Sequence, residues 1–224
     1  MTDAEAETHL RAIRLMMERA TVYRAISAPI ALLGGLLSTS TAAVQLLAIR
    51  DGKSGDALGF YLAWMCVLLL TALANAFFIW RGARLRGEPV VSPAMQLALR
   101  SLVPSFLAGT VASFCVTLTS GQPLLAVLFW QIFYGVGLLA TMNFAPGSLV
   151  ALGWAFLLSG LAAMVYFFYH SLLPEMGLPT PSRESAPLLM GATFGLYHLV
   201  YAVCAWPRES RVLDAIERRP LVHQ

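Results

Sequence analysis

Six long apolar segments occupy most of this chain of 224 residues. A helix needs roughly 20 predominantly apolar residues to cross the hydrocarbon core of a bilayer. The connections between the segments are short, so consecutive helices must run antiparallel. The sequence therefore predicts an all-α polytopic membrane helix bundle, with six transmembrane helices over residues 23–47, 59–80, 95–118, 124–142, 149–172 and 187–206.

The composition and the charge distribution agree with a membrane protein. Apolar residues make up 58% of the chain and charged residues only 12%, whereas a soluble domain carries about 25% charged residues. No Asp or Glu falls within the six segments, and the arginines are scattered at segment ends, which argues against nucleic-acid binding. We expect a cytoplasmic or interfacial amphipathic helix over residues 1–22, a transmembrane domain over 23–206 and a cytoplasmic tail over 207–224.

The basic residues are distributed unevenly between the two sides of the six-span arrangement. Of the 15 Lys and Arg residues, Arg50, Lys53 and Arg183 lie on one side and Arg100 lies within a span. Short loops rich in Lys and Arg stay in the cytoplasm. The pattern predicts a multi-pass protein of the bacterial inner (cytoplasmic) membrane, with both the N-terminus and the C-terminus inside. The basic residues on this inner side are Arg11, Arg14, Arg19, Arg24, Arg81, Arg84, Arg86, Arg208, Arg211, Arg218 and Arg219.

The segment over residues 1–22 has the spacing of an amphipathic helix. Leu10, Ile13 and Met17 recur at helical intervals on one face. A helix of this kind lies in the membrane interface, extends the first span, or packs on a partner. We therefore expect contact with the lipid bilayer, and residues 1–22 are the candidate surface for a protein partner or for homo-oligomer formation.

Two of the returning spans share a sequence pattern. The segments WQIFYGVG (Trp130–Gly137) and YHLVYAVC (Tyr197–Cys204) both read aromatic, polar, two apolar residues, Tyr, small, Val, small. Parallel repeats related by an axis along the membrane normal occur in transporters. The pattern predicts three helical hairpins related in this way, with chance similarity among membrane helices as the alternative.

Neutral polar residues within the spans are the candidate ligand or cavity residues. His198 lies near the middle of the bilayer, and Gln131 holds the matching position in the shared pattern. An imidazole at this depth can bind a ligand, move a proton or make one hydrogen bond to a neighbouring helix. One hypothesis is that the polar groups converge on a single cavity, and the alternative is that they only hold helices together. The candidates are His198, Tyr197, Tyr201, Gln131, Tyr134 and Asn75.

Arg24 and Arg100 occupy equivalent positions near the cytoplasmic ends of the first and third spans. Long basic side chains at this depth can reach the anionic headgroups. If they face inward instead, they form a basic ring at the cytoplasmic mouth of the bundle and favour an anionic substrate or lipid headgroup.

The sequence lacks catalytic and metal-binding patterns. Cys66, Cys115 and Cys204 all lie in apolar segments without metal-ligand spacing, and no nucleophile–base pair or phosphate-binding loop is found. We therefore predict a protein that is not an enzyme and has no metal or cofactor. The absence of an intramembrane carboxylate argues against acid-driven ion coupling. A small permease or facilitator with a neutral polar cavity is favoured, and a non-catalytic membrane sensor or accessory subunit is the alternative.

Two stretches of the chain carry a resemblance to known proteins. They are FAPGSLVALGWAFLLSGLAAM (Phe144–Met164) and PLLMGATFGLYHLVYAVCAWPR (Pro187–Arg208). In these stretches, and along most of its length, the chain resembles a family of uncharacterised bacterial six-helix integral membrane proteins with no assigned activity. The resemblance implies a bacterial inner-membrane location and carries no activity over to this chain.

Overall fold

The computed structural model describes residues 28–53, 56–87, 89–91, 93–143, 145–172 and 181–205. The expected interfacial helix over residues 1–22 and the tail over 207–224 lie outside these ranges. Every regular element within the described residues is helical, and the predicted all-α membrane bundle is confirmed.

Helical passes follow one another along the described chain. The first five are α2 (Ala28–Arg50), α3 (Ala57–Arg86), α4 (Pro93–Ser120), α5 (Pro123–Leu139) and α6 (Gly147–Leu172). The sixth begins as α7 (Ser185–Met190), continues as the π-helix η2 (Gly191–Tyr197), and remains helical as far as Ala205. Of these passes, five are long and apolar enough to cross a membrane, and α5 is a shorter apolar helix.

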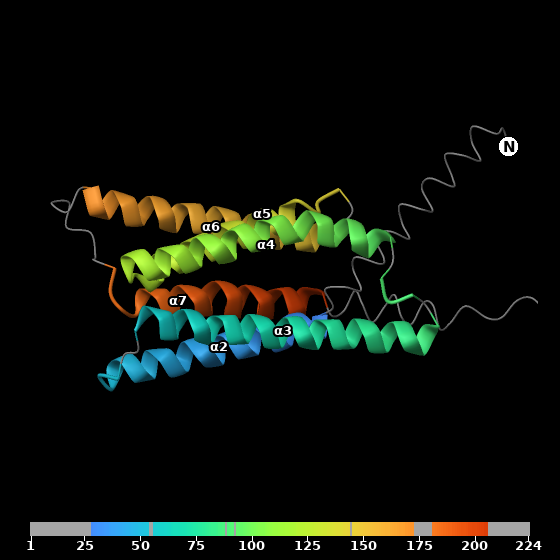
Figure 1. Cartoon of the computed structure of the whole chain (residues 1–224), viewed down its shortest axis with the longest axis horizontal. Coiled ribbons are helices and arrows are strands. Elements are labelled where there is room, and N and C mark those ends of the chain that lie inside the picture. Colours follow the sequence, from blue (N-terminus) through green and yellow to red (C-terminus); the bar gives the residue numbers. More distant parts are fainter. Residues whose placement is uncertain are drawn as a thin grey trace, which may run out of the picture.

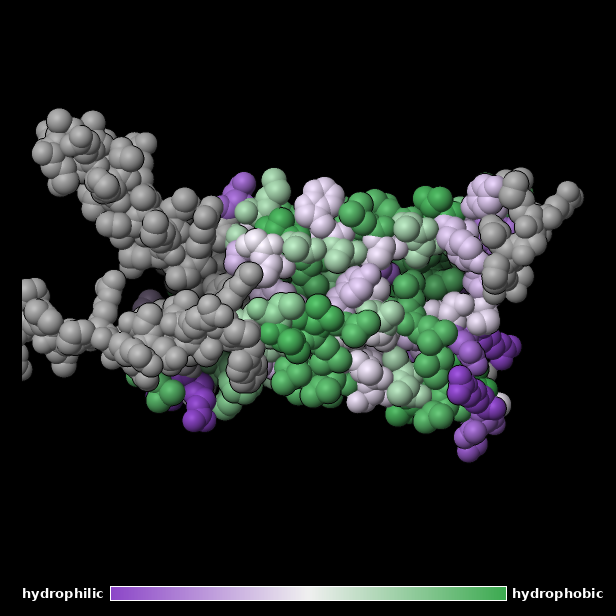
Figure 2. Space-filling model, turned by 180° about the vertical axis from the view of Figure 1, so that it is seen from behind, coloured by the Kyte–Doolittle hydropathy of each residue, from purple (hydrophilic) through white to green (hydrophobic). Residues whose placement is uncertain are grey.

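The surface has the polarity expected of a protein surrounded by lipid. Figure 2 shows hydrophobic residues over the middle of the bundle and hydrophilic residues gathered toward its ends. Leu62 of α3, Leu107 of α4 and Leu158 of α6 are more than half exposed, at 52%, 62% and 58%. Apolar surface of this kind is unfavourable in water and is stabilised by contact with hydrocarbon. The protein is therefore an integral membrane protein.

Local sequence signals determine where the helices begin and end. The Asp56 carboxylate accepts a hydrogen bond from the backbone N–H of Gly59 at 2.9 Å and caps the start of α3. Gly87 ends the same helix with a φ of 65°, a conformation that glycine adopts without a steric penalty. Pro123 begins α5 at a position where its missing N–H would have no helical partner.

The fourth predicted span is too long at its C-terminal end. The α5 helix ends at Leu139 and not at Met142, because the backbone turns over residues 140–143. Within this turn the N–H of Thr141 donates to the carbonyl oxygen of Leu138 at 3.1 Å. Tight-turn bonds of this kind replace the helical ladder and return the chain toward α6.

The passes are arranged in two layers (Figure 1). The helices α4, α5 and α6 pack side by side in one layer, and α2, α3 and the sixth pass form the other. Packing is extensive within each layer, whereas the layers meet through fewer backbone contacts, between α3 and α4, α5 and α7, and α3 and α5. We call this boundary between the two layers the seam.

Glycines let the helices of the α4–α5–α6 layer approach closely. A methyl group added at Gly135 of α5 would lie 2.6 Å from the backbone nitrogen of Leu157 in α6. A methyl group added at Gly109 of α4 would lie 2.6 Å from the Cβ atom of Phe133 in α5. Small residues at such contacts are the usual way in which membrane helices associate, because lipid supplies no hydrophobic driving force between them.

The same kind of contact joins α2 to the sixth pass. A methyl group added at Gly195 would lie 2.5 Å from the hydroxyl oxygen of Thr39, and one at Gly191 would lie 2.9 Å from the Cβ atom of Ala42. The Gly191–Gly195 spacing therefore serves close helix packing, as small residues four positions apart commonly do in membranes.

The three expected hairpins appear only in part in the packing. The pairs α2–α3 and α4–α5 are packed antiparallel neighbours. The third pair spreads over both layers, because α6 packs on α5 whereas α7 and η2 pack on α2. Helix pairing in this bundle thus follows the close glycine contacts as well as the order of the chain.

Gly135→Ala should destabilise the bundle, because the added methyl group meets the backbone of α6 and the two helices would have to separate. We expect the free energy of unfolding to fall by about 1–3 kcal/mol, measured by denaturant unfolding in detergent micelles. Gly147→Ala is the matched control, since its added methyl group has no neighbouring atom within 4 Å. Equal stability of the two variants would contradict the close α5–α6 contact.

Candidate functional site

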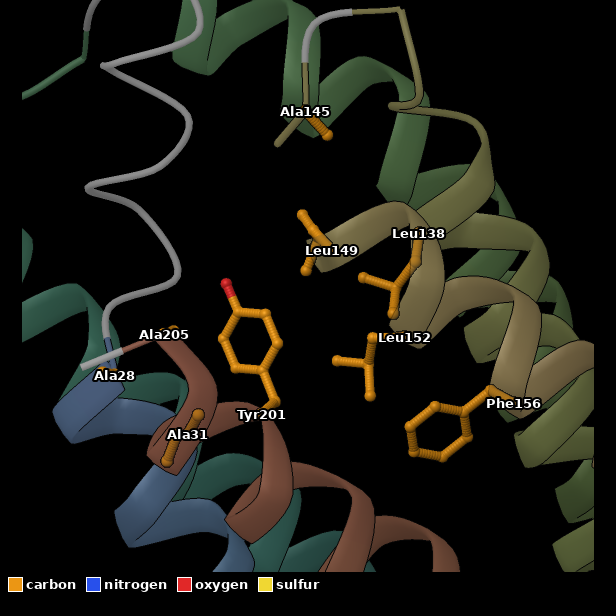
Figure 3. Close-up of a cluster of buried hydrophobic side chains, with 10 residues drawn as sticks. Ala28, Ala31, Leu138, Ala145, Leu149, Leu152, Phe156, Tyr201 and Ala205 are labelled. Carbon is orange, nitrogen blue, oxygen red and sulfur yellow. The ribbon is translucent and has the colours of Figure 1, made fainter. Parts of the chain in front are cut away.

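Aromatic side chains from both layers fill the middle of the seam. Phe156 of α6 is fully buried, and its ring centroid lies 4.7 Å from that of Tyr134 in α5 and 4.8 Å from that of Phe194 in η2. Figure 3 shows Tyr201 of the sixth pass across the seam from Leu152 of α6. Tilted ring contacts of this kind add to the free energy of burial. The layers are thus joined here by side chains and not by close backbone contact.

A hydrogen bond crosses the seam inside this aromatic cluster. The hydroxyl oxygen of Tyr134 lies 2.8 Å from Nε2 of His198, and Nδ1 of His198 lies 3.0 Å from the carbonyl oxygen of Phe194. A carbonyl oxygen can only accept, so Nδ1 of a neutral imidazole carries the proton. Nε2 is then the acceptor, and the Tyr134 hydroxyl is the donor. Two of the predicted site residues are therefore bonded directly to each other.

Gln131 lies three residues before Tyr134 on α5 and is fully buried. Its Nε2 donates to the hydroxyl oxygen of Ser159 in α6 at 2.5 Å, and this hydroxyl donates to the carbonyl oxygen of Ala155 at 2.6 Å. The Oε1 atom of Gln131 has no hydrogen-bond partner in the described part of the chain. A buried polar atom left unpaired costs about 1–3 kcal/mol, so this oxygen is a candidate contact for a ligand.

A second aromatic cluster closes the seam near the start of α3. Tyr61 stacks on Trp130 of α5 with ring centroids 5.0 Å apart, and its hydroxyl donates to the carbonyl oxygen of Thr110 in α4 at 3.1 Å. Trp64 donates from Nε1 to Oε1 of Gln45 in α2 at 3.0 Å. By contrast, the buried Nε1–H group of Trp130 has no acceptor among the described residues. This end of the seam therefore also holds one unpaired polar group.

Asn75 lies on the face of α3 that packs against α2. It follows Thr71 by four residues and Trp64 by eleven on α3, and both of these side chains face α2, so Asn75 shares their inward face. Its side chain is partly buried and takes part in none of the hydrogen bonds of the described chain. At 1.5 Å per residue, Asn75 lies about 21 Å along α3 from Tyr61. Asn75 is thus separated along α3 from the second aromatic cluster.

The two remaining predicted tyrosines pack in the apolar core. Tyr201 is only 5% exposed, and Tyr197 meets Phe156 edge-on with ring centroids 5.3 Å apart. The structure therefore places Tyr134, Tyr197, His198 and Tyr201 in or against one aromatic cluster. Gln131 lies about one helical turn before Tyr134 on α5 and bonds to α6.

Only one of the two basic candidates lies within the described residues. Arg100 is exposed on the surface of α4, where its long side chain can extend to the lipid headgroups. Arg24 lies outside the described residues, so the basic ring at the mouth of the bundle stays a prediction.

Two features of the site were not predicted from the sequence. The π-helix η2 ends immediately before His198, and short π segments frequently occur at functional sites. Gly191 begins this segment and Gly195 lies within it, and they could have indicated an irregular helix, although their spacing fits simple packing equally well. Ser159 is not among the candidate residues named from the sequence, whereas its hydroxyl fixes the orientation of the Gln131 amide.

A scan against protein-family models found no match to this chain, and searches of curated proteins and of solved structures found none either. The resemblance to bacterial six-helix membrane proteins therefore stays a prediction. Among the described residues, no three His, Cys, Asp or Glu side chains lie close enough to hold a metal ion. The site consists of aromatic rings and neutral hydrogen-bonding groups, and the sequence has no carboxylate inside the six spans.

A double-mutant cycle on Tyr134 and His198 measures the bond that crosses the seam. We expect Tyr134→Phe and His198→Leu to show a coupling of roughly 0.6–1.7 kcal/mol in the free energy of unfolding, because each single change leaves the other partner unpaired. The measurement is denaturant unfolding of the single and double variants in detergent micelles. Strictly additive effects of the two changes would contradict the direct bond.

Proposed function

We propose that the protein is a small permease of the facilitator type, through which small uncharged polar solutes cross the membrane along the seam. The observation that carries this proposal is the neutral hydrogen bond between Tyr134 and His198, which joins the two helix layers at the centre of the seam. A bundle that only anchors a chain in lipid needs no polar link at this depth, since apolar packing would serve.

Unpaired polar groups along the seam support the same proposal. Oε1 of Gln131 and Nε1 of Trp130 are buried without partners in the described chain, and hydrocarbon makes such groups costly. A polar solute that moves along the seam would satisfy these groups one after another. The free-energy cost of leaving these groups unpaired in the empty protein is then offset by the hydrogen bonds that they make to the solute during its passage.

The packing of the two layers supports movement at the seam. Glycine contacts hold the helices together inside each layer, whereas longer side chains meet between the layers. Transporters commonly expose a central site to either side by rocking one group of helices against another. In this protein, separation at the seam would break ring contacts and few hydrogen bonds. Membrane hydrogen bonds of this type contribute only about 0.6 kcal/mol on average, so the seam is the boundary that opens most easily.

The charge pattern favours uncharged solutes and passive movement. No Asp or Glu lies within the six spans, so a permeating cation would find no counter-charge in the hydrocarbon. An anion would find no Lys or Arg in the described aromatic clusters that close the seam, and the imidazole of His198 there is neutral. We therefore propose facilitated movement down a concentration gradient, without a coupling ion and without catalysis.

We further propose a bacterial inner membrane as the location, with both termini in the cytoplasm. The distribution of Lys and Arg supports this orientation. At the proposed cytoplasmic end of α3, the guanidinium of Arg84 lies 5.1 Å from the ring centroid of Trp80, a pairing suited to the headgroup region. The alternative role, as a sensor or accessory subunit, rests on the amphipathic residues 1–22 and on the Arg-rich tail over 207–224, both of which lie outside the described structure.

Solute entry into liposomes containing the full-length protein tests the proposal. Glycerol and urea should enter faster than into protein-free liposomes, as followed by light scattering after an osmotic shock, whereas potassium chloride should stay excluded. His198→Ala should lower the protein-dependent rates about tenfold, the equivalent of 1.4 kcal/mol, because Tyr134 loses the partner that positions it.

His170→Ala is the matched control, since His170 lies in the last turn of α6 and away from the Tyr134–His198 bond. It should leave the rates of glycerol and urea entry at the wild-type value. The permease assignment is refuted if the wild-type protein accelerates neither solute, or if His198→Ala and wild type give the same rates.

A further inference from the structure

We propose that the solute recognised at the seam is a hydrogen-bond donor, a small neutral molecule with at least two N–H or O–H groups. This inference rests on the proposed transport function and specifies its substrate class. It follows from the direction of the hydrogen bonds around Gln131 and Tyr134, which lie three residues apart on α5. Each of these side chains ends a chain of bonds that begins at a backbone carbonyl oxygen.

The first chain of hydrogen bonds begins at the carbonyl oxygen of Ala155. The Ser159 hydroxyl has a single proton and donates it to this oxygen at 2.6 Å. The Ser159 oxygen is then free to accept, and it accepts from Nε2 of Gln131 at 2.5 Å. Rotation of the amide by half a turn would instead place Oε1 against an oxygen with no proton left to give. The chain therefore holds the fully buried Gln131 amide with its carbonyl oxygen unpaired.

The second chain begins at the carbonyl oxygen of Phe194. Nδ1 of the neutral His198 ring donates to it at 3.0 Å. Nε2 must then accept, and the Tyr134 hydroxyl donates its only proton to Nε2 at 2.8 Å. The oxygen of Tyr134 keeps its remaining lone pair, so any further hydrogen bond that it makes is one that it accepts.

Both chains thus end in an oxygen atom that can accept and cannot donate. Residues three positions apart lie on one face of a helix, and the rise of 1.5 Å per residue separates Gln131 from Tyr134 by about 4.5 Å along α5. A solute with two donor groups can satisfy both oxygens, as the two amino groups of urea or two hydroxyls of glycerol would. A solute with acceptors only leaves both oxygens unpaired, and sites built around buried polar groups discriminate strongly against such analogues.

Solute entry into liposomes that contain the full-length protein distinguishes donors from acceptors. Urea is the donor probe, and dimethyl sulfoxide, which has an acceptor oxygen and no N–H or O–H group, is the matched probe. Wild-type protein should accelerate urea entry and leave dimethyl sulfoxide entry at the rate of protein-free liposomes. Gln131→Leu should lower the protein-dependent urea rate about tenfold, as expected for one lost hydrogen bond to the solute.

Two more variants complete the test. Ser159→Ala keeps the Gln131 oxygen but frees the amide to rotate, so it should lower urea entry less than Gln131→Leu does. If Gln131→Leu does not fold, the urea rate of Ser159→Ala tests the donor requirement in its place. Gln96→Leu, at an exposed glutamine of α4, should match the wild type.

The possible results separate this inference from the proposed function. Wild-type urea rates in both Gln131→Leu and Ser159→Ala would overturn the donor requirement and leave transport standing. If the protein accelerates dimethyl sulfoxide entry as much as urea entry, the donor requirement is likewise overturned and transport still stands. If the wild-type protein accelerates no solute, the proposed function is overturned, and the donor requirement with it.

Discussion

Close contact between helix backbones at glycine is the interaction on which this structure depends. At Gly135 of α5 and at Gly195 of the sixth pass, a single added methyl group would collide with the neighbouring helix. Lipid is as apolar as the side chains, so helices associate in it through van der Waals packing of this kind. The contacts hold α4, α5 and α6 in one layer and bind α2 to the sixth pass in the other. The two layers are then left to meet through longer side chains.

The kinds of side chain found at the seam follow from this division of the helices into two layers. Where backbones are kept apart, aromatic rings and polar side chains fill the space, and directional hydrogen bonds become the means of joining the layers. The Tyr134–His198 bond is the central one, at 2.8 Å between the hydroxyl oxygen and Nε2. Because the chains of bonds through His198 and Ser159 both start at backbone carbonyls, they fix where protons lie. They leave accepting oxygens on Tyr134 and Gln131. The proposed selectivity for donor solutes is thus a consequence of proton placement.

The spans could be predicted from the sequence because apolar length is a local property that each segment carries by itself. Gln131, Tyr134 and His198 could be singled out because polar side chains are rare and costly in hydrocarbon. The hydrogen bonds that these side chains make could not be predicted. The unpaired oxygen of Gln131, for example, depends on the single hydroxyl proton of Ser159, a residue from a distant segment. Asn75 was grouped with them on residue type alone, whereas its side chain lies on the face of α3 that packs against α2. The layer arrangement depends on which glycines meet in space, which one sequence does not reveal.

Distances between spin labels test most directly whether two rigid layers meet at a weaker seam. Labels at Val111 of α4 and Leu161 of α6 report within one layer, and labels at Leu62 of α3 and Val111 report across the seam; all three side chains are exposed. The native cysteines would first be replaced by alanine. With His198→Ala, the account predicts a broader distance distribution across the seam and an unchanged one within the layer. Equal broadening of both, or no change across the seam, would contradict it.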